Sequence, residues 1–130
     1  MKSIFNFRFT PTVLLTLFIA WIIYQADTDQ DSFLMMLADI QYMDKVAHFT
    51  LFGLLALSVN SAIGFRAYVF GPVSIYLGSV IVLSVTWAEE FSQLAIASRT
   101  FDWVDMLFDV LGIYFFSSDL FLNLRSRLVK

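Results

Sequence analysis

The chain has 130 residues, of which 59% are apolar and 15% are charged, and its formal net charge is −3. Soluble domains carry about a quarter charged residues, so this composition indicates a membrane protein. A bilayer can also solvate the fifteen Phe and three Trp, which a soluble chain of this size could not hide. The absence of cysteine excludes disulfides and thiolate chemistry, and the absence of a basic stripe argues against nucleic-acid binding.

Four long apolar stretches follow one another along the chain. They predict an all-α fold, an integral membrane four-helix bundle that forms a single domain over residues 1–130. The predicted spans cover about residues 12–26, 46–65, 72–97 and 103–122.

The first stretch has a recognisable helix start at Thr10 and Pro11. A hydroxyl can cap the helix there, and proline is tolerated in the first helical turn. A basic beginning followed by an apolar core is also typical of a signal peptide. Because Tyr24 fits poorly before a cleavage site that follows Ala26, we expect a retained membrane anchor.

The loop between the first two stretches carries a helix signal of its own. Asp31 and Ser32 resemble a cap, and apolar residues from Phe33 to Ile40 recur at one-face helical spacing. We therefore predict a short interfacial helix on the outer membrane surface. It could cover the polar site as a lid, although a simple connector is the plainer interpretation.

The ionisable residues divide by sign between the two ends of the predicted spans. One side holds six bases and one acid: Lys2, Arg8, Arg66, Arg125, Arg127, Lys130 and Asp119. The other side holds two bases and ten acids: Lys45, Arg99, Asp27, Asp29, Asp31, Asp39, Asp44, Glu89, Glu90, Asp102, Asp105 and Asp109. Basic residues are retained on the cytoplasmic side, so both termini are predicted to be cytoplasmic and the acidic side to face outward.

Two groups of polar residues enter the outer half of the predicted bundle from the second and third spans. Asp44, Lys45 and His48 share one helix face, and His48, the single histidine of the chain, lies one turn inside an apolar helix. At the end of the third span, Glu90 and Gln93 share a face, whereas the neighbouring Glu89 points about 100° away. The alternative is that these charges merely mark helix ends.

A third group begins with Arg99 and descends into the fourth span as a polar stripe. Asp102, Asp105, Asp109 and Gly112 are spaced by three, four and three residues, so they lie on one helix face. Asp109 lies about 6 Å deeper than Asp105 and needs a partner inside the bundle. Asp102 alone fits a capping or solvated role. Gly112 would let a neighbouring helix approach closely.

These residues, taken in order, resemble the VanZ-like membrane protein family. The matching elements are Asp44-Lys45-x-x-His48-Phe49, Glu90-x-x-Gln93 and Arg99-x-Phe101-Asp102-x-x-Asp105-x-x-x-Asp109-x-x-Gly112, which cover roughly half of the chain. The family pattern usually has Asn where this chain has Asp109. The resemblance implies a multi-pass cell-envelope protein of the bacterial cytoplasmic membrane. The family's namesake is associated with lowered susceptibility to the glycopeptide antibiotic teicoplanin.

The first functional hypothesis is that the site recognises or modifies an envelope lipid, a lipid-linked intermediate or a lipoglycopeptide. Arg99 would then grip a phosphate or carboxylate, and Lys45 would add a point charge. Candidate ligand-binding residues are Asp44, Lys45, Gln93, Arg99, Asp102 and Asp109. The candidate catalytic residues are His48, Glu90 and Asp105, with His48 and Glu90 as the acid–base pair. Whether the protein is an enzyme stays open.

Two other functions remain as alternatives. A metal-dependent membrane hydrolase or transferase would use His48 and the carboxylates to hold a divalent cation, although the sequence contains no recognised ligand motif. Ion or proton movement would need polar residues that continue to the inner half. There the sequence offers only hydroxyl side chains such as Ser58, Ser79 and Ser84, so a closed pocket fits better than a pore.

Overall fold

The computed structural model describes residues 2–28, 36–37, 39–96, 100–118 and 121–123. Four main helices and a small β-hairpin make up most of this part of the chain. In chain order they are α1 (Lys2–Thr28), α3 (Met43–Ala62), β1 (Ala67–Phe70), β2 (Val73–Tyr76), α4 (Leu77–Ser92), the 3-10 helix η1 (Gln93–Ala95) and α5 (Trp103–Ser117). The prediction of a mostly helical chain with four main helices is therefore confirmed.

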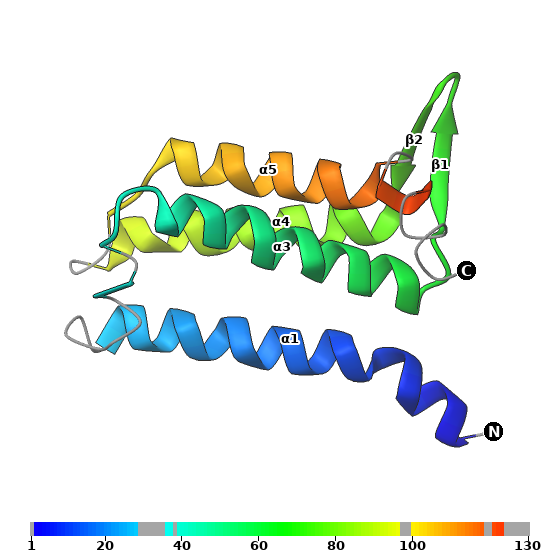
Figure 1. Cartoon of the computed structure of the whole chain (residues 1–130), viewed down its shortest axis with the longest axis horizontal. Coiled ribbons are helices and arrows are strands. Elements are labelled where there is room, and N and C mark those ends of the chain that lie inside the picture. The colour runs from blue at the N-terminus through cyan, green and yellow to red at the C-terminus, as the bar shows by residue number, and fades with distance from the viewer. Residues whose placement is uncertain (1, 29–35, 38, 97–99, 119–120, 124–130) are drawn as a thin grey trace.

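Helix α3 is the central element of the bundle. It packs most extensively against α5 and also contacts α4 and α1, while the hairpin projects from one end (Figure 1). All four helices contribute to the apolar core, which contains Ile19, Phe52, Leu55, Ala56, Val82 and Ile113. The start of α3, the end of α4 and the start of α5 consequently meet at the end opposite the hairpin.

Two glycines bring the backbones of α3 and α5 together. A Cβ atom on Gly112 would lie 2.8 Å from the Cα and C atoms of Phe49 and closer still to its carbonyl oxygen. A Cβ on Gly53 would lie 2.8 Å from the carbonyl oxygen of Gly112. Neither position has room for a larger residue, so the close approach predicted at Gly112 is confirmed. Because Phe49 follows His48, this contact also positions the candidate site.

The third span was predicted to cover residues 72–97, and its predicted start as a helix at residue 72 is wrong. Residues 73–76 form β2, which pairs antiparallel with β1 so that Phe70 faces Val73 across the turn. Gly71 supplies the positive φ of +59° that this two-residue connection requires. Aromatic and β-branched residues make up three of the four positions in each strand, as strands favour. The helix itself begins only at Leu77 and ends at Ser92, followed directly by η1.

The first helix begins earlier than predicted, at Lys2, and includes Pro11 in its interior. An interior proline removes one backbone hydrogen bond and crowds the preceding turn, which bends a helix without necessarily ending it. Helix α1 indeed changes direction near its start (Figure 1). The interfacial helix predicted between Asp31 and Ile40 lies largely outside the described residues, among which Met36 and Leu37 are helical.

In the described part of the chain, one helical segment is long and apolar enough to cross a membrane by length and composition. It covers Arg8–Thr28 in α1. A signal sequence near the N-terminus would meet the same criterion. Helices α4 and α5 have 16 and 15 residues, fewer than the roughly 20 that a full crossing usually needs.

Candidate functional site

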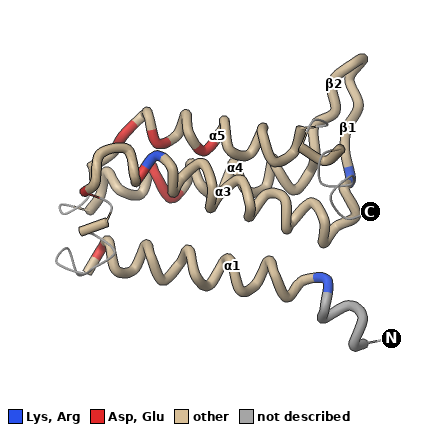
Figure 2. The backbone as a smooth tube through the Cα atoms, viewed as in Figure 1, with Lys and Arg blue, Asp and Glu red and all other residues tan. Residues whose placement is uncertain are grey.

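Most acidic positions of the bundle lie at the end opposite the hairpin, on α3, α4 and α5 among other elements (Figure 2). We call this group the polar cluster. It consists of Asp44, Lys45, His48, Glu90, Gln93, Asp102, Asp105 and Asp109. The structure thus brings together every predicted site residue except Arg99, which lies outside the described residues. The roles assigned to these residues remain predictions.

Lys45 contacts three carboxylates, two of which, Asp102 and Asp105, join α3 to the start of α5. Its Nζ atom lies 3.0 Å from Asp44 Oδ2 and 2.6 Å from Asp102 Oδ2, and it also contacts Asp105 Oδ1. Burial alone would lower the pKa of Lys45, but the hydrogen bonds to Asp102, Asp105 and Asp44 outweigh burial and raise it above its ordinary value. These contacts use the three donors of Lys45, so a phosphate could bind there only by displacing a carboxylate.

Asp102 links the start of α5 to the end of α4. Its Oδ1 atom accepts the N–H of Val104 at 2.8 Å, as a helix N-cap does, and its own N–H donates to Glu90 Oε1 at 3.1 Å. The hydrogen bond from Lys45, followed by that from Val104, holds the pKa of Asp102 below its usual range. The predicted capping role of Asp102 is confirmed.

His48 lies between the two deeper carboxylates of α5. Its Nδ1 atom is 2.7 Å from Asp109 Oδ1, and its Nε2 atom is 3.8 Å from Asp105 Oδ2. Asp109 is 1% exposed and Asp105 is 9% exposed, which agrees with a stripe that faces the bundle interior. The deepest acid therefore has the partner that its position requires, namely the single histidine.

Glu90 enters the cluster from α4 and is fully buried. Its Oε2 atom accepts a hydrogen bond from Gln93 Nε2 at 3.2 Å. The same amide nitrogen lies 3.2 Å from both carboxylate oxygens of Glu89, so Gln93 bridges the two adjacent acids. The sequence analysis had predicted that Glu89 points away from the helix face shared by Glu90 and Gln93. Flexible glutamate and glutamine side chains bring the three groups together across one helical turn.

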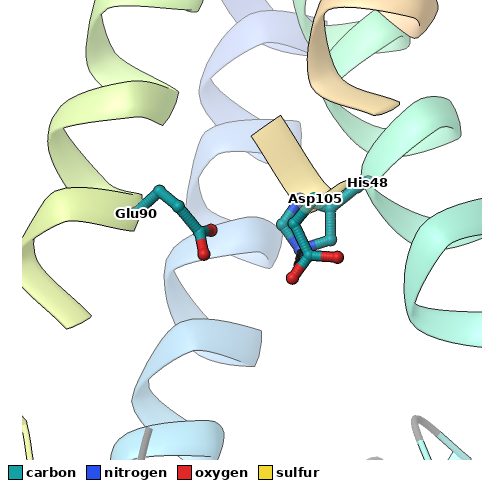
Figure 3. Close-up of side chains that lie close together, drawn as sticks. All are labelled: His48, Glu90 and Asp105. Carbon is teal, nitrogen blue, oxygen red and sulfur yellow. Dashed lines mark ion pairs between the residues drawn. The ribbon is translucent and has the colours of Figure 1, made fainter. Parts of the chain in front are cut away.

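Three of these side chains, from three different helices, converge closely enough to hold a metal ion. One ligand atom each from His48, Glu90 and Asp105 can be chosen so that all lie within 4.8 Å of one another. The carboxylate of Glu90 extends from α4 toward the other two side chains (Figure 3). The arrangement offers one imidazole nitrogen and two carboxylate oxygens in a largely buried setting.

A second polar group, which the sequence analysis missed, lies near the hairpin. Asn60 is fully buried, and its Nδ2 atom donates to Ser79 Oγ at 2.9 Å and to Ser117 Oγ at 3.4 Å. The two hydroxyls are 2.7 Å apart. The expectation that only hydroxyl side chains occupy this half of the bundle was therefore wrong. Asn60 was missed because no spacing pattern in its mostly apolar segment distinguishes it from the neighbouring residues.

Thr86 was also missed, and for this residue the sequence did contain a signal. Gly78, Val82, Thr86 and Glu90 recur every four residues and form the buried face of α4. Thr86 thus lies one turn below Glu90, with its hydroxyl donating to the carbonyl oxygen of Leu83. Extending the polar spacing backward from Glu90 would have identified it.

Comparisons of the chain with protein-family models, with curated proteins and with solved structures find no match. The functional argument consequently depends on the chain's own residues and their geometry.

Proposed function

We propose that this chain is a VanZ-like, multi-pass protein of the bacterial cytoplasmic membrane, with the polar cluster at its outer face. In this proposal the cluster recognises or modifies the polar head of an envelope lipid, a lipid-linked intermediate or a lipoglycopeptide. The observation that carries the proposal is the burial of charged and polar side chains in a bundle whose surface exposes many large apolar ones.

Several charged and polar groups lie inside this bundle beside its apolar core, and many large apolar groups lie on its surface. The largest fully buried side chains are Glu90, Asn60, Thr86 and Asp109. By contrast, Leu17 of α1, Val85 of α4 and Leu107 of α5 are 62%, 60% and 54% exposed. Apolar surface of this extent needs a partner or a membrane to cover it. A bilayer would cover all the helices at once, which favours several spans over one anchor.

The charge at the two ends supports one orientation. The end that bears the hairpin carries Arg8, which donates to the carbonyl oxygen of Ser61, and Arg66, which precedes β1. The opposite end carries the acidic positions (Figure 2). Basic residues favour the cytoplasmic side, so the polar cluster would face outward.

An aromatic group flanks the polar cluster at the level where a membrane surface would lie. The rings of Phe91 and Phe101 are stacked with centroids 5.6 Å apart, and Trp103 meets Phe101 edge-on at 4.8 Å. Trp103 is 68% exposed. Exposed aromatic rings are enriched at membrane–water boundaries, so this group supports a ligand that is part apolar and part polar.

The orientation can be tested with single cysteines, because the natural chain contains none. A cysteine that replaces Asp39, in the turn before α3, is expected to react with a membrane-impermeant thiol reagent in intact cells. A cysteine that replaces Ser74, on the exposed hairpin, is expected to react only after the membrane is permeabilised. Labelling of Ser74→Cys in intact cells would place the polar cluster in the cytoplasm and contradict the proposal.

The ligand class can be tested by drug susceptibility in a teicoplanin-susceptible bacterium that expresses the chain. Wild type is expected to lower susceptibility to teicoplanin but not to a glycopeptide without a lipid tail. Glu90→Gln should abolish the effect, because it replaces the buried carboxylate at the centre of the cluster with an uncharged amide. The matched control Asp39→Asn should behave like wild type. Equal susceptibility with wild type and Glu90→Gln, at equal membrane levels, would count against lipoglycopeptide recognition.

A further inference from the structure

The polar cluster contains more negative charge than its described cations can balance. Lys45 is the one lysine that contacts it within the described ranges, against five carboxylates: Asp44, Glu90, Asp102, Asp105 and Asp109. Glu90 and Asp109 are 0% and 1% exposed, so water does little to stabilise charge on them. Buried carboxylates require a nearby cation or a proton. The cluster is therefore suited to bind a cation.

His48 is held in the manner of a metal-binding histidine. In the neutral tautomer that carries its proton on Nδ1, His48 donates to Asp109 Oδ1 at 2.7 Å, and Nε2 keeps its lone pair. Histidine ligands commonly donate their other ring N–H to a carboxylate, which fixes the ring and raises its basicity. Nε2 faces Asp105 Oδ2 at 3.8 Å, too far for a hydrogen bond. Two ligands of one tetrahedral zinc ion are separated by a similar distance, roughly 3.4 Å.

Carboxylate oxygens of Asp105 and Glu90 point toward His48 and could act as further ligands of an ion bound there. Lys45 contacts Asp105 Oδ1, so Asp105 Oδ2 remains directed toward His48. Glu90 extends toward the same point from α4 (Figure 3). In addition, Asp109 Oδ2 is buried and has no hydrogen-bond partner among the described residues. A buried carboxylate oxygen without a partner calls for an explanation, and a cation bound near the histidine is one.

We infer that His48, Glu90 and Asp105 bind one divalent transition-metal ion, with Asp109 as the residue that positions His48. Zn²⁺ fits best, because it accepts imidazole nitrogen and carboxylate oxygen together and takes four ligands. Two carboxylates would neutralise its charge. Three protein ligands leave a position that could take a phosphate or carboxylate oxygen of an amphiphile. That last step rests on the proposed function, whereas the metal site itself rests on the cluster geometry alone.

The test uses the full chain, purified without a histidine tag in detergent and treated with a chelator. His48 is the only histidine, so a histidine-labelled sample gives one set of ring nitrogen resonances. One equivalent of Zn²⁺ is expected to shift the Nε2 resonance strongly and to leave Nδ1 protonated. Mg²⁺ at the same concentration is expected to produce no such shift, because it prefers oxygen ligands and its own waters.

Three variants then assign the ligands. Asp105→Asn and Glu90→Gln should each weaken Zn²⁺ affinity, measured by competition with a chromophoric chelator, by about tenfold or more. The matched control Asp44→Asn removes a carboxylate that contacts Lys45 but not His48, and it should change the affinity less than about threefold. Circular dichroism of each variant establishes that it is folded.

An unchanged His48 resonance in folded wild type at saturating Zn²⁺ would overturn the metal site, and this result requires no variant. Equal loss of affinity in Asp44→Asn and Asp105→Asn would also overturn it, since the ion would then be bound by general negative charge. Neither result would alter the cysteine labelling or the drug susceptibility. Failure of the metal site is therefore distinguishable from failure of the proposed function.

Discussion

Gly112→Ala is expected to destabilise the protein by about 1–3 kcal/mol, although alanine is the better helix former by about 1 kcal/mol. The added methyl group would overlap the backbone of Phe49, which is not a flexible side chain that can move aside. Helix α5 would have to shift away from α3, and the pairing of His48 with Asp109 would be stretched. Chemical unfolding in detergent measures the loss of stability.

Leu111→Ala provides the control for Gly112→Ala, because Leu111 is the preceding residue of α5 and is 44% exposed. Its truncation should have a clearly smaller effect on stability. A Gly112→Ala variant as stable as wild type, or more stable, would mean that α3 and α5 do not approach at this position. Retained Zn²⁺ binding in that variant would lead to the same conclusion.

Asp109→Leu is expected to cost about 1–3 kcal/mol, whereas Asp109→Asn should be tolerated. Leucine has a similar size but leaves the ring nitrogen of His48 buried without an acceptor. Asparagine keeps an oxygen that can accept the 2.7 Å hydrogen bond now made to Asp109 Oδ1. The VanZ-like pattern, with asparagine at this position, agrees with that expectation. Thermal unfolding in detergent compares the two variants.

A double substitution makes the Asp109 prediction sharper. Combining Asp109→Leu with His48→Phe replaces both partners of the hydrogen bond with apolar groups, which should recover part of the stability lost in the single variant. A large loss for Asp109→Asn would instead mean that Asp109 carries a structural charge. If Asp109→Leu unfolds at the same temperature as wild type, the hydrogen bond between Asp109 and His48 contributes nothing measurable to stability.

The composition of the polar cluster was predictable because local geometry determines it. Spacings of three and four residues place Asp105, Asp109 and Gly112 on one face of α5, whatever the helix packs against. The same rule placed Lys45 and His48 together on α3. Specific partners between helices were not predictable. Lys45 contacts Asp102 and Asp105 across 57 and 60 residues, and no local pattern encodes such a choice.

The hairpin was missed because its sequence is compatible with both a β-strand and a helix. A short run of aromatic and β-branched residues fits either a strand or the start of an apolar helix, and periodicity cannot separate them. Gly71 and Pro72 also mark either a helix start or a two-residue turn. Antiparallel pairing from Ala67 to Tyr76 satisfies the backbone groups that face each other across the hairpin, and the folded chain adopts this alternative.

The long sequence separation of the cluster contacts has a consequence for biogenesis. Asp109 meets His48 from 61 residues further along the chain, so α5 reaches the ribosome exit after α3 is already complete. If α5 crosses the bilayer, as in the proposed topology, each unpaired carboxylate near its middle opposes insertion by about 3 kcal/mol. An earlier helix that presents Lys45 and His48 would lower that barrier. Helix α3 would thus act as an internal chaperone for the insertion of α5.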